Sequence, residues 1–276
     1  MENEKSWNGL NAGLVAIDPK TGQILTMVGS RDYFDKNIDG NYNIATANRQ
    51  PGSSFKPFIY ATAFSKGFTP ETVLFDLPTE FQSTCNAYGK ALPGHSQEKC
   101  YKPDNYDGKF RGPMTLRDAL GQSINVVAVK LFYLAGLTDS LKTAESMGIS
   151  TLTDIGRYGL TLVIGGGEVS LLDMTSAYGV FGNNGIRNPY TGILKVEKGD
   201  GKILEEYSPR SYEVLPKNVT LTVSDVLADN VARTPTFGSS SPLFISGKDV
   251  AVKTGTTNSN KDAWTLGYTP SIVVGV

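Results

Sequence analysis

The chain has 276 residues and a mass of 29.7 kDa, which suits one large domain or two small ones. Hydrophobic residues make up 39% of the chain and charged residues 19%, so apolar material suffices for a core and a disordered chain is excluded. The formal charge of −1 argues against a protein that binds nucleic acid through a basic surface, and no apolar run approaches the roughly 20 residues that span a bilayer.

The chain opens with two β-rich runs, 14–17 and 24–28, joined by the turn residues Asp18-Pro19-Lys20-Thr21-Gly22-Gln23. Apolar residues at helical spacing then predict a helix that begins near Ser53 and runs to Phe64. A long surface excursion, 82–112, follows, with many Gly, Pro, Asn and Tyr residues and little periodicity.

Thr115 is expected to cap a helix whose apolar positions continue to Leu131, and another helix is expected from Ser170. Further helices are predicted at 139–147 and 223–231, and a hairpin is predicted at 193–207. Three closing strands are predicted at 250–254, 264–268 and 271–276. This order predicts an α+β fold: an antiparallel sheet from N- and C-terminal strands packs with helices, a mainly helical segment forms a second lobe, and the ligand site lies in the cleft between them.

Few side chains are available for metal or triad chemistry. A structural zinc site takes about four cysteine or histidine ligands, whereas the chain has two cysteines and one histidine. His95 lies in a polar, turn-rich stretch that predicts an exposed loop. Cys85 and Cys100 flank this stretch; they could form a disulfide in an oxidising compartment or remain thiols in a reducing one, and the sequence leaves this open.

Three short motifs indicate serine acyl-enzyme chemistry: Ser53-Ser54-Phe55-Lys56, Ser123-Ile124-Asn125 and Lys253-Thr254-Gly255. Each is weak alone, because Ser96-Gln97-Glu98-Lys99 and Lys20-Thr21-Gly22 match the same patterns. The second copies are expected in a polar loop and in the turn of the opening hairpin.

Context favours the first copies. Ser53 follows Pro51-Gly52 at a helix start, where backbone N–H groups are free, and Lys56 lies about one turn later on the same face. Such a lysine acts as a base near neutral pH only if burial or a second cation lowers its pKa. By itself, however, Ser53 is more typical of a serine that caps a helix.

The other two motifs also have ordinary explanations. Lys253 follows an alternating strand and would attract a carboxylate, and Gly255 would let a substrate backbone approach closely, but a strand that ends in a polar turn looks the same. Ser123 and Asn125 could point into one cleft only if the helix is interrupted there.

Taken together, the motifs and their order resemble the transpeptidase domain of class A penicillin-binding proteins, the peptidoglycan synthases. The likeness covers residues 10–276, after a polar lead-in at 1–9. It includes longer strings around the motifs, at 49–57, 103–108, 115–117, 165–169, 253–257 and 262–264. The resemblance implies a penicillin-binding, serine β-lactamase-like fold.

The resemblance also implies roles. Ser53 would attack the carbonyl between two D-alanines of a peptidoglycan stem peptide, and Lys56 would take its proton, kept neutral partly by Lys253. Ser123 would relay a proton toward the leaving D-alanine, and Asn125 would bind the substrate amide and position Lys56.

Substrate binding would fall to the strand of the third motif. Lys253, Thr254 and Thr256 would hold the terminal carboxylate, beside Gly255 and Thr257. The backbone N–H groups of Ser53 and Thr256 would form the oxyanion hole. An amine of a second stem peptide would resolve the acyl-enzyme, β-lactam antibiotics would acylate the same serine, and no metal or diffusible cofactor is implied.

Family members also carry a membrane anchor, a glycosyltransferase domain, a further strand and a C-terminal helix, which are not expected in this chain. It is therefore expected to be a piece of a protein that works at the extracytoplasmic face of the bacterial cell membrane. Two other functions stay open. One is a hydrolase, either a D,D-carboxypeptidase or a β-lactamase, although Ser-Ile-Asn replaces Ser-Asp-Asn and Glu168 lies in a triple-glycine segment. The other is a non-catalytic β-lactam sensor.

Overall fold

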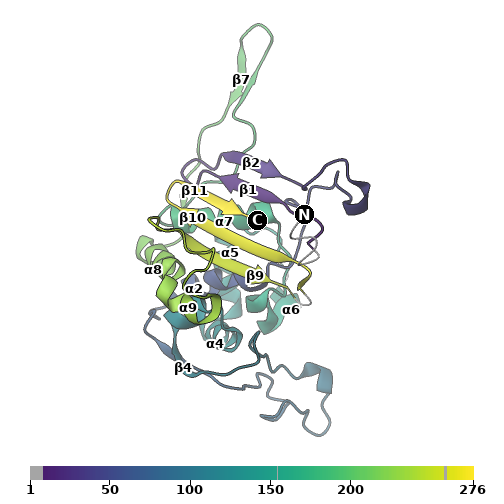
Figure 1. Ribbon diagram of the computed structural model, residues 1–276, viewed down its shortest axis with the longest axis vertical. Coiled ribbons are helices and arrows are strands. Elements are labelled where there is room, and N and C mark those ends of the chain that lie inside the picture. Colours follow the sequence, from purple (N-terminus) through teal and green to yellow (C-terminus); the bar gives the residue numbers. More distant parts are fainter. Residues whose placement is uncertain (1–8, 154, 258–259) are drawn as a thin grey trace.

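A five-stranded antiparallel sheet organises the molecule (Figure 1). The computed structural model describes residues 9–153, 155–257 and 260–276, so most of the expected lead-in at 1–9 lies outside the described residues. The strands follow the order β2-β1-β11-β10-β9. Their bounds are β1 (Leu14–Ile17), β2 (Ile24–Val28), β9 (Ala251–Thr256), β10 (Ala263–Thr269) and β11 (Ile272–Gly275).

The two ends of the chain meet in this sheet. Val15 of β1 pairs with Gly275 of β11, and Trp264 of β10 pairs with Gly255 of β9. The opening hairpin turns at Gly22, whose φ of +79° suits glycine. The antiparallel sheet from N- and C-terminal strands is therefore confirmed.

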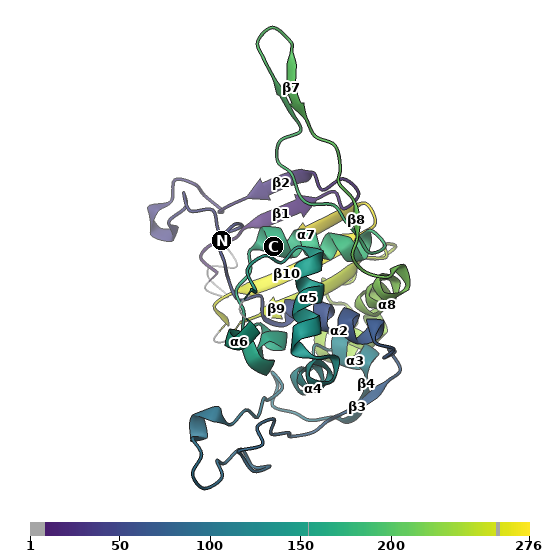
Figure 2. The same cartoon turned by 180° about the vertical axis from the view of Figure 1, so that it is seen from behind.

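Helices cover one face of the sheet, as the view from behind shows (Figure 2). The α-helices are α2 (Lys56–Ser65), α3 (Leu116–Gly121), α4 (Asn125–Ala135), α5 (Leu137–Met147), α6 (Ile155–Tyr158), α7 (Leu171–Gly182), α8 (Lys217–Ala228) and α9 (Asn230–Phe237). The 3-10 helices are η1 (Lys36–Ile38), η2 (Gly52–Phe55), η3 (Gln97–Lys99) and η4 (Gly159–Ile164). No helix in the described part of the chain is long and apolar enough to cross a membrane.

Helix α7 occupies the centre of the core. The helix was predicted from Ser170, and Ser170 caps it by accepting a hydrogen bond from the Asp173 N–H at 3.0 Å. The rings of Tyr178 and Phe181 pack against Phe58 of α2 at centroid distances of 5.8 and 6.0 Å. Because α2 and α7 are buried on nearly all sides, they form a rigid base for the segment that precedes α2.

Two helix predictions need correction. The helix that Thr115 caps ends at Gly121, and a separate helix, α4, begins at Asn125. The helix predicted at 223–231 instead begins at Lys217 and stops before Asp229, whose side chain caps α9 by accepting a hydrogen bond from Ala232 N–H. Apolar spacing hides both breaks, because buried residues continue on either side of them.

Two appendages leave the body of the molecule (Figure 1). One is the hairpin of β6 (Lys195–Glu197) and β7 (Ile203–Glu206), whose strands are shorter than predicted. The other is the excursion between β3 (Val73–Asp76) and β4 (Gly112–Thr115), where Cys85 and Cys100 form a disulfide and His95 is exposed. A small pair, β5 (Ile186–Arg187) and β8 (Tyr212–Glu213), lies at the base of the hairpin.

Candidate active site

Ser53 lies in the short 3-10 helix η2, directly before α2. The next residue, Ser54, is fully buried: its hydroxyl donates to the Pro51 carbonyl at 2.6 Å, and its own carbonyl accepts from the Tyr178 hydroxyl at 2.5 Å. Ser53 is only half-buried. The core therefore fixes the turn at Ser54 and leaves Ser53 as the serine that a substrate can reach.

Glycines let three backbone segments meet beside Ser53. A Cβ added to Gly52 would lie 2.5 Å from the Thr256 carbonyl oxygen, and one added to Gly165 would lie 2.2 Å from the Gly52 nitrogen. A Cβ on Gly255 would lie 2.1 Å from the Pro51 carbonyl oxygen. Any side chain at these positions would separate the segments, so the backbone of Thr256 lies next to the start of η2 only because glycine occupies them.

Lys56 begins α2 and is completely buried. Its Nζ donates to the Ser123 carbonyl at 2.6 Å and to Asn125 Oδ1 at 2.8 Å, with Ser123 Oγ at 3.4 Å. Burial, and then the charge of Lys253, holds the pKa of Lys56 well below its usual range. Both causes favour the neutral amine, which is the form that a general base requires.

Ser123 sits between α3 and α4 in a left-handed conformation with φ of 61°. Few residues other than glycine adopt this region, and in folded proteins such positions cluster at functional sites. The conformation interrupts the helix and brings the Ser123 carbonyl and hydroxyl to the same ammonium as Asn125. The interruption that the second motif requires is therefore present.

Lys253 of β9 reaches Ser123 from the other side. Its Nζ donates to Ser123 Oγ and to the Thr254 carbonyl, both at 2.8 Å. Burial, and then the nearby positive charge of Arg233, lowers the pKa of Lys253 to about 7. One hydroxyl, that of Ser123, thus lies between two buried lysines whose charges repel.

Two further residues hold this arrangement, and sequence reasoning assigned neither a role. Asn105 accepts hydrogen bonds from the backbone N–H groups of Asn125 and Val126 at 3.0 and 3.2 Å. These two N–H groups at the start of α4 would otherwise lack a partner within the helix. The side-chain amide of Asn105 donates to the buried carboxylate of Asp76 at 2.8 and 3.0 Å. The only signal in the sequence is that Asn105 lies in the string 103–108.

Arg233 is the second residue that was not predicted. It is 4% exposed, and its guanidinium donates to the carbonyls of Leu243 and Leu227. It lines a small cavity together with Lys253. A lone arginine in a polar helix carries no pattern that distinguishes it from a surface residue.

The competing motif copies lie elsewhere. Ser96 and Lys99 are exposed at either end of η3, in the excursion. Lys20 is exposed in the opening turn, and the adjacent Gly22 provides the left-handed turn residue, as expected. The fold therefore brings together the first copies and excludes the second copies from the site.

The threonines of the third motif divide between two environments. Strand alternation places the side chains of Thr254 and Thr256 on one face of β9 and that of Lys253 on the other. Thr257 is buried, and its hydroxyl accepts from Asp262 N–H at 2.8 Å.

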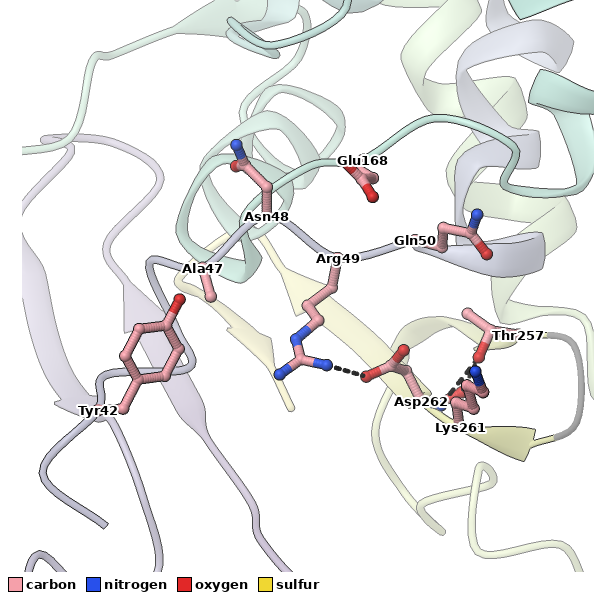
Figure 3. A pocket seen from close by; sticks show the side chains of 9 residues that line it. All are labelled: Tyr42, Ala47, Asn48, Arg49, Gln50, Glu168, Thr257, Lys261 and Asp262. Atoms are coloured by element: carbon pink, nitrogen blue, oxygen red, sulfur yellow. Dashed lines mark hydrogen bonds and ion pairs between the residues drawn. The ribbon is translucent and has the colours of Figure 1, made fainter. Parts of the chain in front are cut away.

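A pocket of about 470 Å³ opens next to Thr257 (Figure 3). We call it the charged pocket. Its polar and charged lining comes from three parts of the chain, namely Arg49, Gln50, Glu168, Thr257, Lys261 and Asp262.

One group of possible metal ligands lies together in the described part of the chain, formed by Glu80, Cys85 and Cys100. It lies in the excursion, and both sulfurs belong to the disulfide, so neither is a thiolate. The residues around Lys56 and Lys253 are donors and neutral acceptors, which suits an anionic substrate rather than a cation.

Comparison with known proteins identifies the family of the chain. The family described as "Penicillin binding protein transpeptidase domain" matches residues 12–275. The chain belongs to this family. Penicillin-binding protein 1A of Aquifex aeolicus is 37% identical over 267 residues, which cover 97% of this chain and 34% of the relative. Penicillin-binding protein 1A of Neisseria cinerea is 34% identical and is covered to 32%.

Solved structures agree with the family assignment. Penicillin-binding protein 1A from Haemophilus influenzae matches with a TM-score of 0.77 and 27% identity, over 96% of this chain and 42% of that one. PonA1 from Mycobacterium tuberculosis in complex with penicillin V matches with the same TM-score and 26% identity, over 95% and 67%. The penicillin-binding fold is therefore confirmed, and the chain spans about a third of the length of the curated relatives it matches.

Proposed function

We propose that this chain is the D,D-transpeptidase part of a peptidoglycan synthase and that Ser53 forms the acyl-enzyme. The observation that carries the proposal is the placement of Lys56. It is completely buried one turn after an accessible serine, it is held by Ser123 and Asn125, and its pKa is lowered by burial and by Lys253. A buried lysine held in this way can serve as a base, whereas a lysine on the surface stays charged in water.

Acylation begins at the Ser53 hydroxyl. Neutral Lys56 takes the proton of the Ser53 hydroxyl as Oγ attacks the carbonyl carbon between the two terminal D-alanines. The developing oxyanion is held by the N–H groups of Ser53 and Thr256, where one such donor contributes about 3 kcal/mol. The amide C–N bond breaks, and the leaving D-alanine nitrogen receives a proton through the Ser123 hydroxyl. The hydroxyls of Thr254 and Thr256 hold the terminal carboxylate of the substrate, and Lys253, on the other face of β9, attracts it through its positive charge.

The acyl-enzyme is resolved by an amine. The amine of a second stem peptide attacks the ester carbonyl and loses a proton to Lys56, and the bond to Ser53 Oγ breaks as Oγ regains a proton. The product is the cross-linking amide. A β-lactam acylates Ser53 in the same way. PonA1, which this chain resembles, has been solved with penicillin V, and that likeness supports binding of β-lactams here.

Family membership also supports a cellular location. We place residues 10–276 in a longer protein that acts at the extracytoplasmic face of the bacterial membrane, where peptidoglycan is cross-linked. The disulfide between Cys85 and Cys100 supports this placement, because disulfides persist in oxidising compartments.

The test is acylation by a fluorescent penicillin, with the labelled peptide located by mass spectrometry. We expect a stable adduct on Ser53 that the Ser53→Ala variant does not form. The matched control is Ser96→Ala, which removes the serine of the exposed second S-x-x-K copy and is expected to label like the wild type.

The alternatives predict other results. Rapid turnover of the drug would favour a β-lactamase, and release of D-alanine without transfer to any amine would favour a carboxypeptidase. A permanent adduct with no turnover of peptide would favour a sensor. A folded chain that remains unlabelled would refute the assignment of Ser53.

A further inference from the structure

Asp76 is a fully buried carboxylate that lies outside all three motifs and has no role in the acylation steps above. It ends β3, at the base of the excursion. Asn105 Nδ2 donates to its Oδ1 at 2.8 Å and to its Oδ2 at 3.0 Å, and the Arg111 backbone N–H donates to Oδ2 at 2.9 Å. Both oxygens of the carboxylate therefore accept from donors in the later part of the excursion.

The charge of Asp76 is compensated from two elements. The Arg111 guanidinium lies 3.9 Å from Asp76 Oδ2 and also pairs with the exposed carboxylate of Asp107 at 2.7 Å. From α4, Lys130 Nζ donates to the Phe75 carbonyl at 2.6 Å. Burial lowers the pKa of Lys130, and the negative charge of Asp76 opposes this shift. Because a buried charge is costly unless it is paired and hydrogen-bonded, this surrounding allows a carboxylate at position 76.

Asn105 connects Asp76 to the start of α4. Its Oδ1 accepts from the backbone N–H groups of Asn125 and Val126, and its Nδ2 donates to the Lys109 carbonyl at 2.7 Å as well as to Asp76. A carboxylate only accepts hydrogen bonds, so the amide presents its NH2 group to Asp76 and its oxygen to α4. The orientation of Asn105, and with it the position of the first turn of α4, therefore depends on Asp76.

Helix α4 begins with the residue that holds the proposed base. Asn125 Oδ1 accepts from Lys56 Nζ at 2.8 Å, and Asn125 Nδ2 donates to the Asp104 carbonyl at 3.0 Å. Asp104 directly precedes Asn105, so the excursion holds both the backbone and the side chain of Asn125. Hydrogen bonds thus run from Asp76 to the buried amine through two side chains, those of Asn105 and Asn125.

We propose that Asp76 is a positioning residue for the acylation step. Its carboxylate orients Asn105, and Asn105 sets the position of Asn125 at the start of α4. Asn125 in turn holds the amine of Lys56. This inference rests on the proposed function, in which Lys56 takes the proton of Ser53. Asp76 contacts neither the substrate nor the reacting atoms and acts through the residues between them.

The experiment measures acylation by a fluorescent penicillin at several pH values. Rapid mixing at increasing drug concentrations separates the binding constant of the drug from the first-order rate constant of acylation. This rate constant describes folded molecules alone, so a loss of folded protein does not change it. The test variant is Asp76→Asn, which keeps the shape of the side chain but turns an NH2 group toward a donor. The matched control is Asp107→Asn, which makes the same change at the exposed partner of Arg111.

We expect Asp76→Asn to lower the acylation rate constant about tenfold, the effect of about one lost hydrogen bond, with the binding constant unchanged. The acid-side midpoint of the pH profile should also fall by about half a unit, because a displaced Asn125 oxygen and a missing negative charge both stabilise the Lys56 ammonium less. The Ser123 carbonyl and Lys253, which also act on this ammonium, are left in place. A change that affected only folding would leave this midpoint where it is, and Asp107→Asn should match the wild type.

A second variant breaks the same link from the other side. Asn105→Asp keeps an acceptor for α4 but places a second carboxylate against Asp76, and it should also lower the rate constant about tenfold. In the double variant an amide lies at position 76 and a carboxylate at position 105, so a donor faces an acceptor again. Its rate constant should therefore be no lower than that of the slower single variant.

Three results would overturn the inference. One is a wild-type rate constant and pH midpoint in Asp76→Asn, or, if that variant does not fold, a wild-type rate constant in Asn105→Asp. Another is a double variant in which the two losses multiply, because the two residues would then act independently. The third is an equal loss in Asp107→Asn. A wild type that is never acylated would instead refute the proposed function itself.

Discussion

The buried ammonium of Lys253 should make the stability of this protein depend on pH. The pKa of this lysine is lowered to about 7 in the folded chain, whereas an unfolded chain gives lysine a pKa of about 10.4. Between these two values the unfolded state binds more protons than the folded state. The free energy of unfolding therefore rises with pH across this window, and the penalty for burying the charge is fully present below about pH 7.

The magnitude follows from the two pKa values. The penalty is about 4 kcal/mol at pH 7 and about 2 kcal/mol at pH 9, so Lys253 alone should raise the free energy of unfolding by about 2 kcal/mol between them. The Lys253→Met variant keeps much of the side-chain volume and has no charge, so its stability should rise less over the same interval. Lys56, whose pKa is also lowered, contributes in the same direction in both proteins.

The assay is denaturant unfolding at several pH values from 7 to 9. This range stays below the titration of the buried tyrosines, such as Tyr178, whose pKa is raised by burial. Lys198→Met, in the exposed hairpin, is the control and should give a curve parallel to the wild type. If the curves of Lys253→Met and the wild type are also parallel, Lys253 is not a lysine with a strongly lowered pKa and the electrostatic account of the site fails.

Three further predictions concern the residues around the lysines. Ser123→Gly should be more stable than Ser123→Ala by about 1 kcal/mol in thermal unfolding, because only glycine adopts the positive φ without strain. Both variants should be acylated slowly. Equal stability would mean that the left-handed conformation is not maintained. Asn105→Ala removes the acceptor for the Asn125 N–H and should cost about 2 kcal/mol, together with slower labelling by penicillin; unchanged labelling would show that Asn105 does not support the site. Replacing Cys85 and Cys100 with serine should lower stability by about 3 kcal/mol, measured by denaturant unfolding, and a protein of unchanged stability would show that the excursion does not depend on its cross-link.

Local signals in the sequence were enough for much of the fold. The β-rich runs at 14–17 and 24–28 and the helix start at Ser170 depend on neighbours within a few residues, and the structure has these elements where they were predicted. The break at Ser123 was not predicted as such, because it depends on how α3 and α4 pack on the rest of the molecule. The same applies to the early start of α8 at Lys217, where Val219 and Thr220 of the first turn are buried against the rest of the molecule.

The sequence by itself determined which residue types could perform acyl transfer: a serine one turn before a lysine at a helix start, and a lysine at the end of a strand. It also contained two copies of each pattern, and only the tertiary structure decided between them. The reason is that the pKa of a lysine depends on burial and on nearby charges. Lys56 meets Ser123, 67 positions away, and Ser123 meets Lys253 after another 130 positions. Lys99 and Lys20 have the same local sequence patterns, but the fold leaves both exposed and away from the site.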